Sequence, residues 1–202
     1  RWLSDWSSDV CSSDLEKVLV IGPSGAGKTT LVSCLAQNLS SYEGEVNVDN
    51  VELRHINHES FLEEAGYIRQ SHFLFNDSIK NNIILAQEYN HEKLMKVLKE
   101  VDLLDWVLTL EQKEEHMLIN DGSNISGGQR QRISIARELY HDFAMLFIDE
   151  PSASLDDVTS QRIYETLLNL DKTIVCVTHR HIDYLKPHFD KVIELEPLGG
   201  HA

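Results

Sequence analysis

The feature that most constrains the fold is a glycine-rich segment, GPSGAGKT at residues 22–29, which stands between an apolar run and a helical pattern. The run KVLVI at residues 17–21 is rich in β-branched residues and predicts a buried strand. Leucines at every fourth position predict a helix over residues 29–39. A strand, a glycine-rich turn and a helix in this order are typical of α/β proteins, in which ligands bind beyond the carboxyl ends of the strands.

The glycine-rich segment fits the pattern G-x-x-x-x-G-K-[ST], and it stands in the strand-to-helix context that this pattern requires. Glycines let backbone N–H groups curl around phosphate oxygens, and the helix that follows adds a partial positive charge. Lys28 is expected to reach the β- and γ-phosphates, and the hydroxyl of Thr29 to ligate Mg²⁺. The predicted phosphate-binding residues are Gly22, Pro23, Ser24, Gly25, Ala26, Gly27, Lys28, Thr29 and Thr30. By itself the segment indicates a nucleoside triphosphatase, as against an ordinary glycine-rich turn.

Apolar runs and helical patterns alternate along the rest of the chain, which predicts an α/β fold with a mostly parallel sheet. The wholly apolar run AMLFI at residues 144–148 indicates a central parallel strand. Further strands are predicted at residues 44–51, 67–69, 173–177 and 191–195. Helices are predicted over most of residues 76–118, over 126–140 with Ser126 as the N-cap, and over 158–170; Leu94, Val97, Leu98 and Val101 mark one apolar helix face.

Charge and composition exclude several classes of protein. The 202 residues, a length that suits one domain, include 18 Lys and Arg against 33 Asp and Glu, a net charge of −15. This acidity disfavours binding to nucleic acid or anionic membranes through bulk charge, and we expect no nucleic-acid partner. No apolar run is long enough to span a bilayer. Three cysteines without a repeated spacing indicate neither disulfides nor a zinc site, and Cys34 and Cys176 are expected to be buried thiols.

The first fifteen residues, RWLSDWSSDVCSSDL, differ from the rest of the chain. They show no helical or strand periodicity, and they lack the apolar core of a signal peptide. Residues 5–15 resemble the translation of a sequencing adapter, so we expect residues 1–15 to be non-native and the natural protein to continue upstream of Glu16. The alternative is a genuine disordered leader. We therefore discount Trp2 and Trp6 as aromatic residues that could stack on a nucleobase.

Two carboxylates, Asp149 and Glu150, follow the apolar run at residues 144–148. An aspartate at the end of such a strand matches the second nucleotide-binding motif, in which it holds the coordination shell of Mg²⁺. The adjacent Glu150 is then placed to polarise the attacking water as a general base. The alternative is a solvated acidic strand end, which the phosphate-binding pattern disfavours.

The segment NISGGQRQR at residues 124–132 resembles the signature motif of the ATP-binding cassette (ABC) proteins, with Ile125 in place of the commoner leucine. The resemblance covers essentially all of residues 16–202. It implies a P-loop NTPase (RecA-like) core with an inserted helical subdomain, here with the N-terminal strands missing. It also implies that Ser126, Gly127, Gly128 and Gln129 bind the γ-phosphate of an ATP held by a second cassette in a head-to-tail dimer. We expect the core at residues 16–75 and 141–202 and the helical subdomain at about 76–140.

Three further positions match the family in order along the chain. His179 stands where the family has a switch histidine that contacts the γ-phosphate and couples to the catalytic glutamate; without this context a structural histidine would be the better interpretation. Gln70 resembles the glutamine that contacts Mg²⁺ and transmits motion to the membrane domain, as against an ordinary surface glutamine. Asp156, in the segment SASLD, would line the dimer interface. His181 lies near His179, but the segment offers no third ligand for a metal.

The stretch FLFNDSIKNNI at residues 73–83 resembles the segment of exporter cassettes that receives coupling helices from transmembrane domains, although its apolar residues could equally be local core. We expect an ATPase that uses ATP and Mg²⁺ to power export at the cytoplasmic face of the cell membrane, with transmembrane domains fused upstream. The alternatives are a non-transport ABC ATPase of translation or DNA repair, and a non-hydrolysing partner in a heterodimer.

Overall fold

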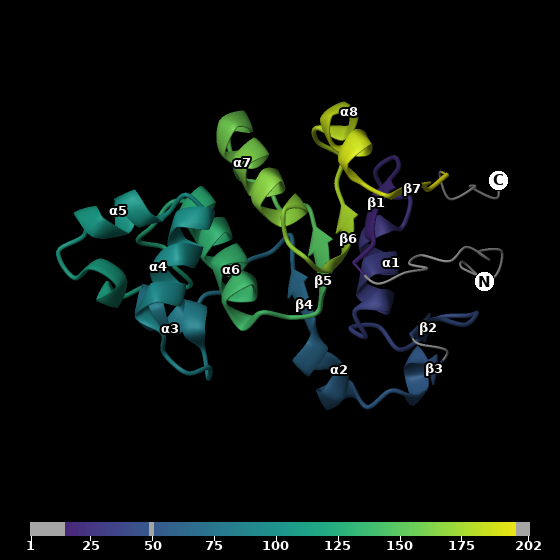
Figure 1. Ribbon diagram of the computed structural model, residues 1–202, viewed down its shortest axis with the longest axis horizontal. Coiled ribbons are helices and arrows are strands. Elements are labelled where there is room, and N and C mark those ends of the chain that lie inside the picture. Colours follow the sequence, from purple (N-terminus) through teal and green to yellow (C-terminus); the bar gives the residue numbers. More distant parts are fainter. Residues whose placement is uncertain (1–14, 49–50, 197–202) are drawn as a thin grey trace. The chain divides into compact units, whose positions relative to one another are not determined.

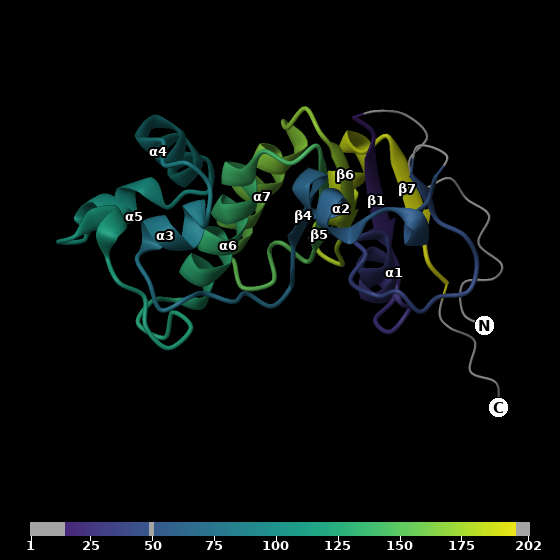
Figure 2. The same cartoon turned by 90° about the horizontal axis from the view of Figure 1, so that it is seen from below.

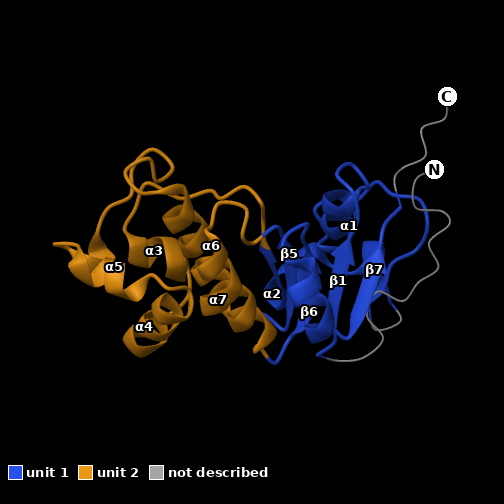
Figure 3. Cartoon of the chain, turned by 90° about the horizontal axis from the view of Figure 1, so that it is seen from above, with its two compact units in different colours: residues 1–67, 143–150, 171–202 blue, residues 68–142, 151–170 orange. Residues whose placement is uncertain are grey.

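The structure, a computed structural model, describes residues 15–48 and 51–196 (Figure 1). Residues 1–14, which hold nearly all of the segment expected to be non-native, lie outside the described residues, as do Trp2 and Trp6. The chain divides into two compact units (Figure 3). The first unit comprises residues 1–67, 143–150 and 171–202, and the second comprises residues 68–142 and 151–170.

A five-stranded sheet with the strand order β4-β5-β6-β1-β7 organises the first unit. Strand β1 pairs in parallel with β6 on one side and β7 on the other, and β5 pairs in parallel with β6. The predicted parallel α/β sheet is confirmed. Four of the five positions in each of β1, β5 and β6 are buried, as expected for strands covered on both faces. The strands are β1 Lys17–Ile21, β4 Ala65–Ile68, β5 Met145–Asp149, β6 Thr173–Val177 and β7 Lys191–Glu194.

Helix α1 (Lys28–Leu35) follows β1 through the glycine-rich segment and packs against β5 and β6 (Figure 2). Its buried side chains, among them Val32 and Leu35, join Val20 and Val175 in the core of the unit. Phe61 stacks on Phe147 with the ring centroids 6.3 Å apart. This core fixes the strand-to-helix turn in place. The remaining elements of the unit are β2 Asn47–Val48, β3 Val51–Glu52, η1 Leu53–His55, α2 His58–Glu64, α8 Ile182–Leu185 and η3 Lys186–His188.

Two predicted elements of this unit are wrong in extent. The helix expected to reach residue 39 ends at Leu35, because Gln37 takes the left-handed backbone conformation (φ 53°) and its side-chain Nε2 donates to the main-chain oxygen of Leu53 at 2.7 Å. Leu39 is exposed as a result. The single strand expected at residues 44–51 is an antiparallel pair, with β2 at Asn47–Val48 and β3 starting at Val51.

The second unit is helical, and most of its longer helices begin at a capped residue. The side chains of Ser78, Asn90, Ser126 and Asp156 each accept a hydrogen bond from the backbone N–H three residues later. The predicted apolar face of residues 94–101 is buried, and α4 packs against α6. The elements are α3 Ile79–Ile84, α4 His91–Glu100, α5 Leu104–Thr109, η2 Lys113–Glu115, α6 Gly127–His141 and α7 Asp157–Leu168.

None of the helices within residues 15–48 and 51–196 is both long enough and apolar enough to cross a membrane. Cys34 and Cys176 are buried free thiols, as predicted.

Candidate nucleotide site

The glycine-rich segment forms a loop whose backbone favours glycine at three positions. Gly22 has a φ of 150°, and a Cβ atom there would lie 2.6 Å from the main-chain oxygen of Leu195. Gly25 and Gly27 also have positive φ angles, 81° and 86°. Gly27 is the N-cap of α1, and the first helical hydrogen bond runs from Leu31 N to Gly27 O. The backbone N–H groups of the first helical turn therefore have no partner within the helix, which is the arrangement that binds phosphate.

The ammonium group of Lys28 folds back over this loop. Its Nζ donates to the main-chain oxygens of Gly22 and Pro23, each at 2.9 Å. Both partners are neutral carbonyls, so the positive charge stays beside the loop and can attract a phosphate. The structure thus places Lys28 and the loop glycines together, as the sequence pattern requires.

Asp149 ends β5 directly beside the loop. Its Oδ1 accepts a hydrogen bond from Thr29 Oγ1 at 3.2 Å, and only 2% of the residue is exposed. Burial raises the pKa of Asp149; the Thr29 hydrogen bond and the Lys28 charge oppose this shift, and the Glu150 charge adds to it.

These groups fit Mg²⁺ as the ligand. Within residues 15–48 and 51–196, no three His, Cys, Asp or Glu side chains cluster to form a metal site made of protein ligands alone. Magnesium does not need one, because it is commonly held by one or two carboxylate or hydroxyl oxygens, water and the phosphates of a nucleotide. Asp149 and Thr29 supply such oxygens.

Glu150, the residue after β5, is held in one orientation by the end of β6. Its backbone is left-handed (φ 52°), an unusual conformation for a residue other than glycine, and its N–H donates to the main-chain oxygen of Val177 at 2.9 Å. Oε1 of Glu150 lies 2.6 Å from Nδ1 of His179, and Oε2 accepts from the hydroxyl of Thr178 at 3.3 Å. The predicted pair of Glu150 and His179 is therefore in direct contact.

Two further residues, Thr178 and Cys176, lie near this pair. Thr178 is fully buried, and its hydroxyl orients the Glu150 carboxylate. It was not among the predicted site residues, although its place directly before His179 is the available sequence signal. Cys176 lies in the same strand end; burial raises its pKa, and the Glu150 and Asp149 charges raise it further, so the thiol stays neutral.

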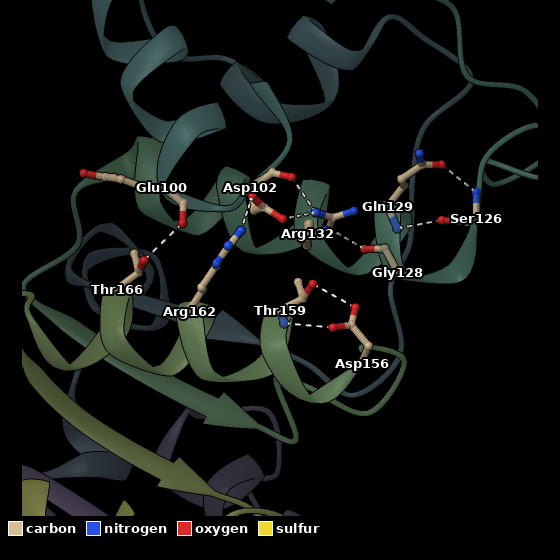
Figure 4. A network of polar contacts seen from close by, with 10 residues as sticks. All are labelled: Glu100, Asp102, Ser126, Gly128, Gln129, Arg132, Asp156, Thr159, Arg162 and Thr166. Carbon is tan, nitrogen blue, oxygen red and sulfur yellow. Dashed lines mark hydrogen bonds and ion pairs between the residues drawn. The ribbon is translucent and has the colours of Figure 1, made fainter. Parts of the chain in front are cut away.

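The signature segment in the second unit starts helix α6 with a capping box. Ser126 Oγ accepts from Gln129 N at 3.2 Å, and Gln129 Oε1 accepts from Ser126 N at 2.8 Å, a complete capping box at the start of the 15-residue α6 (Figure 4). The predicted N-cap is confirmed. A Cβ on Gly128 would lie 3.3 Å from the Leu155 side chain, so a glycine allows the following loop to come close.

That loop, residues 152–156, is attached to α6 and leads into α7. Ser154 N donates to Gln131 Oε1 at 2.9 Å, a contact that the sequence did not predict. Asp156 caps α7 by accepting from Thr159 N at 3.0 Å and Thr159 Oγ1 at 2.8 Å (Figure 4). The Thr159 N–H bond is the main cause that lowers the pKa of Asp156.

The predicted site residues therefore divide between the two units. The glycine-rich loop, Lys28, Asp149, Glu150 and His179 lie in the first unit, where contacts join them. Gln70, which is exposed, and the segment Ser126–Gln129 lie in the second unit.

Comparison with known proteins gives consistent matches. A family model described as ABC transporter matches residues 8–153. The chain is 33% identical, over 166 residues, to the transport/processing ATP-binding protein ComA of Streptococcus pneumoniae serotype 4. The aligned region covers 81% of this chain and 23% of that protein. It is also 32% identical, over 187 residues, to an ATP-dependent lipid A-core flippase of Francisella tularensis subsp. holarctica. That aligned region covers 92% of this chain and 30% of the flippase.

A solved structure of a bacterial Atm1-family ABC exporter with ATP bound superposes with a TM-score of 0.83 and 28% identity. The match covers 92% of this chain and 32% of that chain. The chain thus spans between about a quarter and a third of the length of these relatives.

Proposed function

This chain belongs to the ABC transporter family, and on that premise we propose that it is the nucleotide-binding domain of a larger exporter, where it binds ATP with Mg²⁺ and hydrolyses it to power transport. The observation that carries the proposal is the Glu150 carboxylate, held by His179 and Thr178 at the strand ends that also bear Asp149 and the glycine-rich loop. A phosphate cradle and an oriented carboxylate are the two parts that ATP hydrolysis needs.

Binding starts from the loop. The free N–H groups at the start of α1 and the Lys28 ammonium neutralise the β- and γ-phosphates, as Lys28 exchanges its carbonyl partners for phosphate oxygens. Thr29 and Asp149 would hold Mg²⁺, with Gln70 as a further ligand. When bound, Mg²⁺ would supply positive charge that offsets the negative charge of the phosphates.

Hydrolysis depends on Glu150 and His179. Glu150 acts as the general base that orients the attacking water and accepts its proton, because its carboxylate is fixed from two sides. Because Nδ1 of His179 contacts Glu150, Nε2 is the ring nitrogen left to face the γ-phosphate. The His179 side chain is 62% exposed, so it can reach a ligand.

A second cassette completes the site in the proposed head-to-tail dimer. The capped start of α6 is formed by Ser126, Gly127, Gly128 and Gln129. The backbone N–H groups of its two glycines and the partial positive charge of the helix start would face the γ-phosphate of an ATP bound by the opposite subunit. Asp156 would lie at the same interface.

The remaining partner is a membrane domain. Phe73 and Phe75, after Gln70, are 62% and 48% exposed and form an edge-to-face pair with centroids 5.0 Å apart. Such a pair suits contact with coupling helices of transmembrane domains, which we place upstream on the same natural protein, at the cytoplasmic face of the cell membrane. A relative from Haemophilus influenzae is named a probable ABC transporter ATP-binding/permease protein.

Within this chain, we propose residues 16–202 as the cassette, with the core at 16–75 and 141–202 and the helical subdomain at about 76–140. Residues 1–15 are proposed to be non-native.

The test is ATP hydrolysis by the full-length natural protein purified from membranes. We expect hydrolysis that requires Mg²⁺. Lys28→Met should weaken ATP binding by about 10-fold or more, because it removes charged hydrogen bonds. The control is Lys96→Met, at an exposed lysine on α4. Absence of Mg²⁺-dependent hydrolysis, or equal behaviour of the two variants, would contradict the proposal.

A further inference from the structure

One carboxylate in the second unit, that of Asp102, binds arginines from two different helices. Asp102 lies just beyond α4, in the left-handed backbone conformation (φ 57°). Its Oδ2 accepts from Nη1 of Arg132 on α6 at 3.2 Å, and its Oδ1 accepts from Nη1 of Arg162 on α7 at 3.0 Å (Figure 4). The two oxygens thus join α6 to α7 through the end of α4.

Arg132 is the more firmly held of the two arginines. Its side chain is 16% exposed, against 59% for that of Arg162. Besides the carboxylate, Arg132 donates to the main-chain oxygen of Asp102, and its Nε donates to the main-chain oxygen of Gly128 at 3.3 Å. Burial lowers the pKa of Arg132, whereas the charges of Asp102 and, to a smaller extent, Asp156 favour its ionised form. Arg132 therefore connects Asp102 with the signature turn.

A second contact joins the end of α4 to α7. Thr166 Oγ1, on α7, donates to the main-chain oxygen of Glu100 at 3.0 Å (Figure 4). The end of α4 thus contacts α7 at two points, through Arg162 and through Thr166. Both contacts lie within one compact unit.

The two helices that Asp102 joins begin at the residues proposed to face the second cassette. Helix α6 starts after its cap Ser126, and α7 starts after its cap Asp156. Helices of 15 and 12 residues are stiff, so a constraint on their flanks also fixes where their first turns lie.

We propose that Asp102 is a positioning residue that, through Arg132 and Arg162, fixes the first turns of α6 and α7 relative to one another, so that Ser126 and Asp156 meet a second copy of the cassette together. The proposal rests on the proposed function, because it requires ATP to be enclosed between two cassettes. Asp102 acts only through the two arginines and does not touch the nucleotide.

The experiment uses the full-length protein with Glu150→Gln, which is expected to bind ATP without hydrolysing it, and measures labelled ATP retained after rapid gel filtration. Asp102→Asn is the test variant, because asparagine tolerates the left-handed backbone but carries no charge. The ATP concentration for half-maximal retention should rise by at least about fivefold, the upper range for one surface ion pair. Affinity for MgADP, which reports on the glycine-rich loop alone, should change by less than about twofold.

Glu100→Gln is the matched control. It removes the charge that pairs with Lys96 along α4 at 3.8 Å, but it leaves the main-chain bond from Thr166 to Glu100 in place. Its ATP retention should equal that of the parent. Adding Arg132→Lys to Asp102→Asn should weaken retention by less than the product of the two single effects, because the two residues act as one unit.

Three results would overturn the inference. Equal ATP retention by Asp102→Asn and its parent would show that Asp102 positions nothing. An equal loss of MgADP affinity and ATP retention would mean general damage to the fold. If the Glu150→Gln parent binds MgADP but retains no ATP, then two cassettes do not enclose ATP. That result would contradict the proposed function itself.

Discussion

The imidazole Nδ1 of His179 lies 2.6 Å from the carboxylate Oε1 of Glu150, and this contact joins the ends of the neighbouring strands β5 and β6. The two partners differ in freedom. Glu150 is 5% exposed and its N–H extends the strand pairing, whereas the His179 side chain is 62% exposed. The carboxylate is therefore the fixed member, and the imidazole is the member that can adjust to a bound phosphate.

Glu150→Gln should abolish most turnover without removing ATP binding. Glutamine keeps the shape of the side chain but cannot accept the proton of the attacking water, so kcat should fall by about 10²–10⁴-fold. The measurement is steady-state phosphate release alongside the affinity for MgATP. Glu63→Gln, at an exposed glutamate on α2, is the control and should behave as wild type. Unchanged turnover in Glu150→Gln would remove Glu150 as the base.

His179→Ala should lower kcat by about 10²–10³-fold, the usual cost of losing one group that stabilises developing charge. The KM for ATP should change much less, because the loop and Lys28 bind the ground state. His188→Ala serves as the control, since that exposed histidine contacts a residue of its own segment, Tyr184, through its main-chain oxygen 3.1 Å away and through its ring. A rise in KM with kcat preserved would instead assign His179 to nucleotide binding.

The sheet could be predicted because runs of β-branched and apolar residues leave few alternatives to a buried parallel strand. Helix ends were less predictable. The regular leucine spacing extended the predicted helix to residue 39, but the hydrogen bond from Gln37 to Leu53 ends it at Leu35. Since Gln37 and Leu53 are 16 residues apart, no local pattern in the sequence contains that contact.

The same limit applies to the site. Motifs identified Lys28, Asp149, Glu150 and His179, because each occupies a fixed place relative to a strand. Contacts between positions far apart in the sequence were missed: Thr178 and Glu150 are 28 positions apart, Ser154 and Gln131 are 23 apart, and Asp102 and Arg162 are 60 apart. Motifs thus indicate the groups proposed to do the chemistry, and the fold is needed to find side-chain contacts that join distant positions.

Asp149→Asn should stabilise the nucleotide-free protein at neutral pH. The folded-state pKa of Asp149 lies above its ordinary value of 3.8, so between these two pKa values the folded protein keeps a proton that the unfolded chain releases. Stability therefore falls as pH rises through this window, and the loss persists above it. Asparagine removes the loss, and the unfolding midpoint should rise by ~2–4 °C for each kcal/mol recovered.

The control for this prediction is the same comparison below the ordinary pKa of aspartate, where both forms are neutral and the two midpoints should converge. MgATP should reverse the order at neutral pH, because the charged carboxylate of Asp149 binds Mg²⁺ more strongly than the neutral amide of the variant does. If Asp149→Asn is less stable than wild type at neutral pH without nucleotide, burial of the charged Asp149 carboxylate does not lower the free energy of unfolding.

The phosphate loop has two reasons to use glycine, a backbone conformation that other residues disfavour and close contact with neighbouring atoms. Comparison of Gly22→Ala with Gly25→Ala should separate them. At Gly22 the backbone conformation is unfavourable for alanine and the new Cβ would lie 2.6 Å from the Leu195 oxygen, so strain and overlap add. At Gly25 the φ of 81° is also unfavourable, but nothing lies within 4 Å of the new atom.

We therefore expect Gly22→Ala to lower the free energy of unfolding by about 2–4 kcal/mol, from strained backbone and overpacking together. Gly25→Ala should cost only about 1–2 kcal/mol, the penalty of the left-handed backbone alone. Denaturant titration of the nucleotide-free protein measures both. The order should reverse for MgATP affinity, with Gly25→Ala the more damaging variant. A methyl group at Gly25 enters open space on the side of the loop where phosphate is proposed to bind, whereas one at Gly22 meets Leu195. Equal effects on stability would mean that the contact with Leu195 imposes no constraint on the loop.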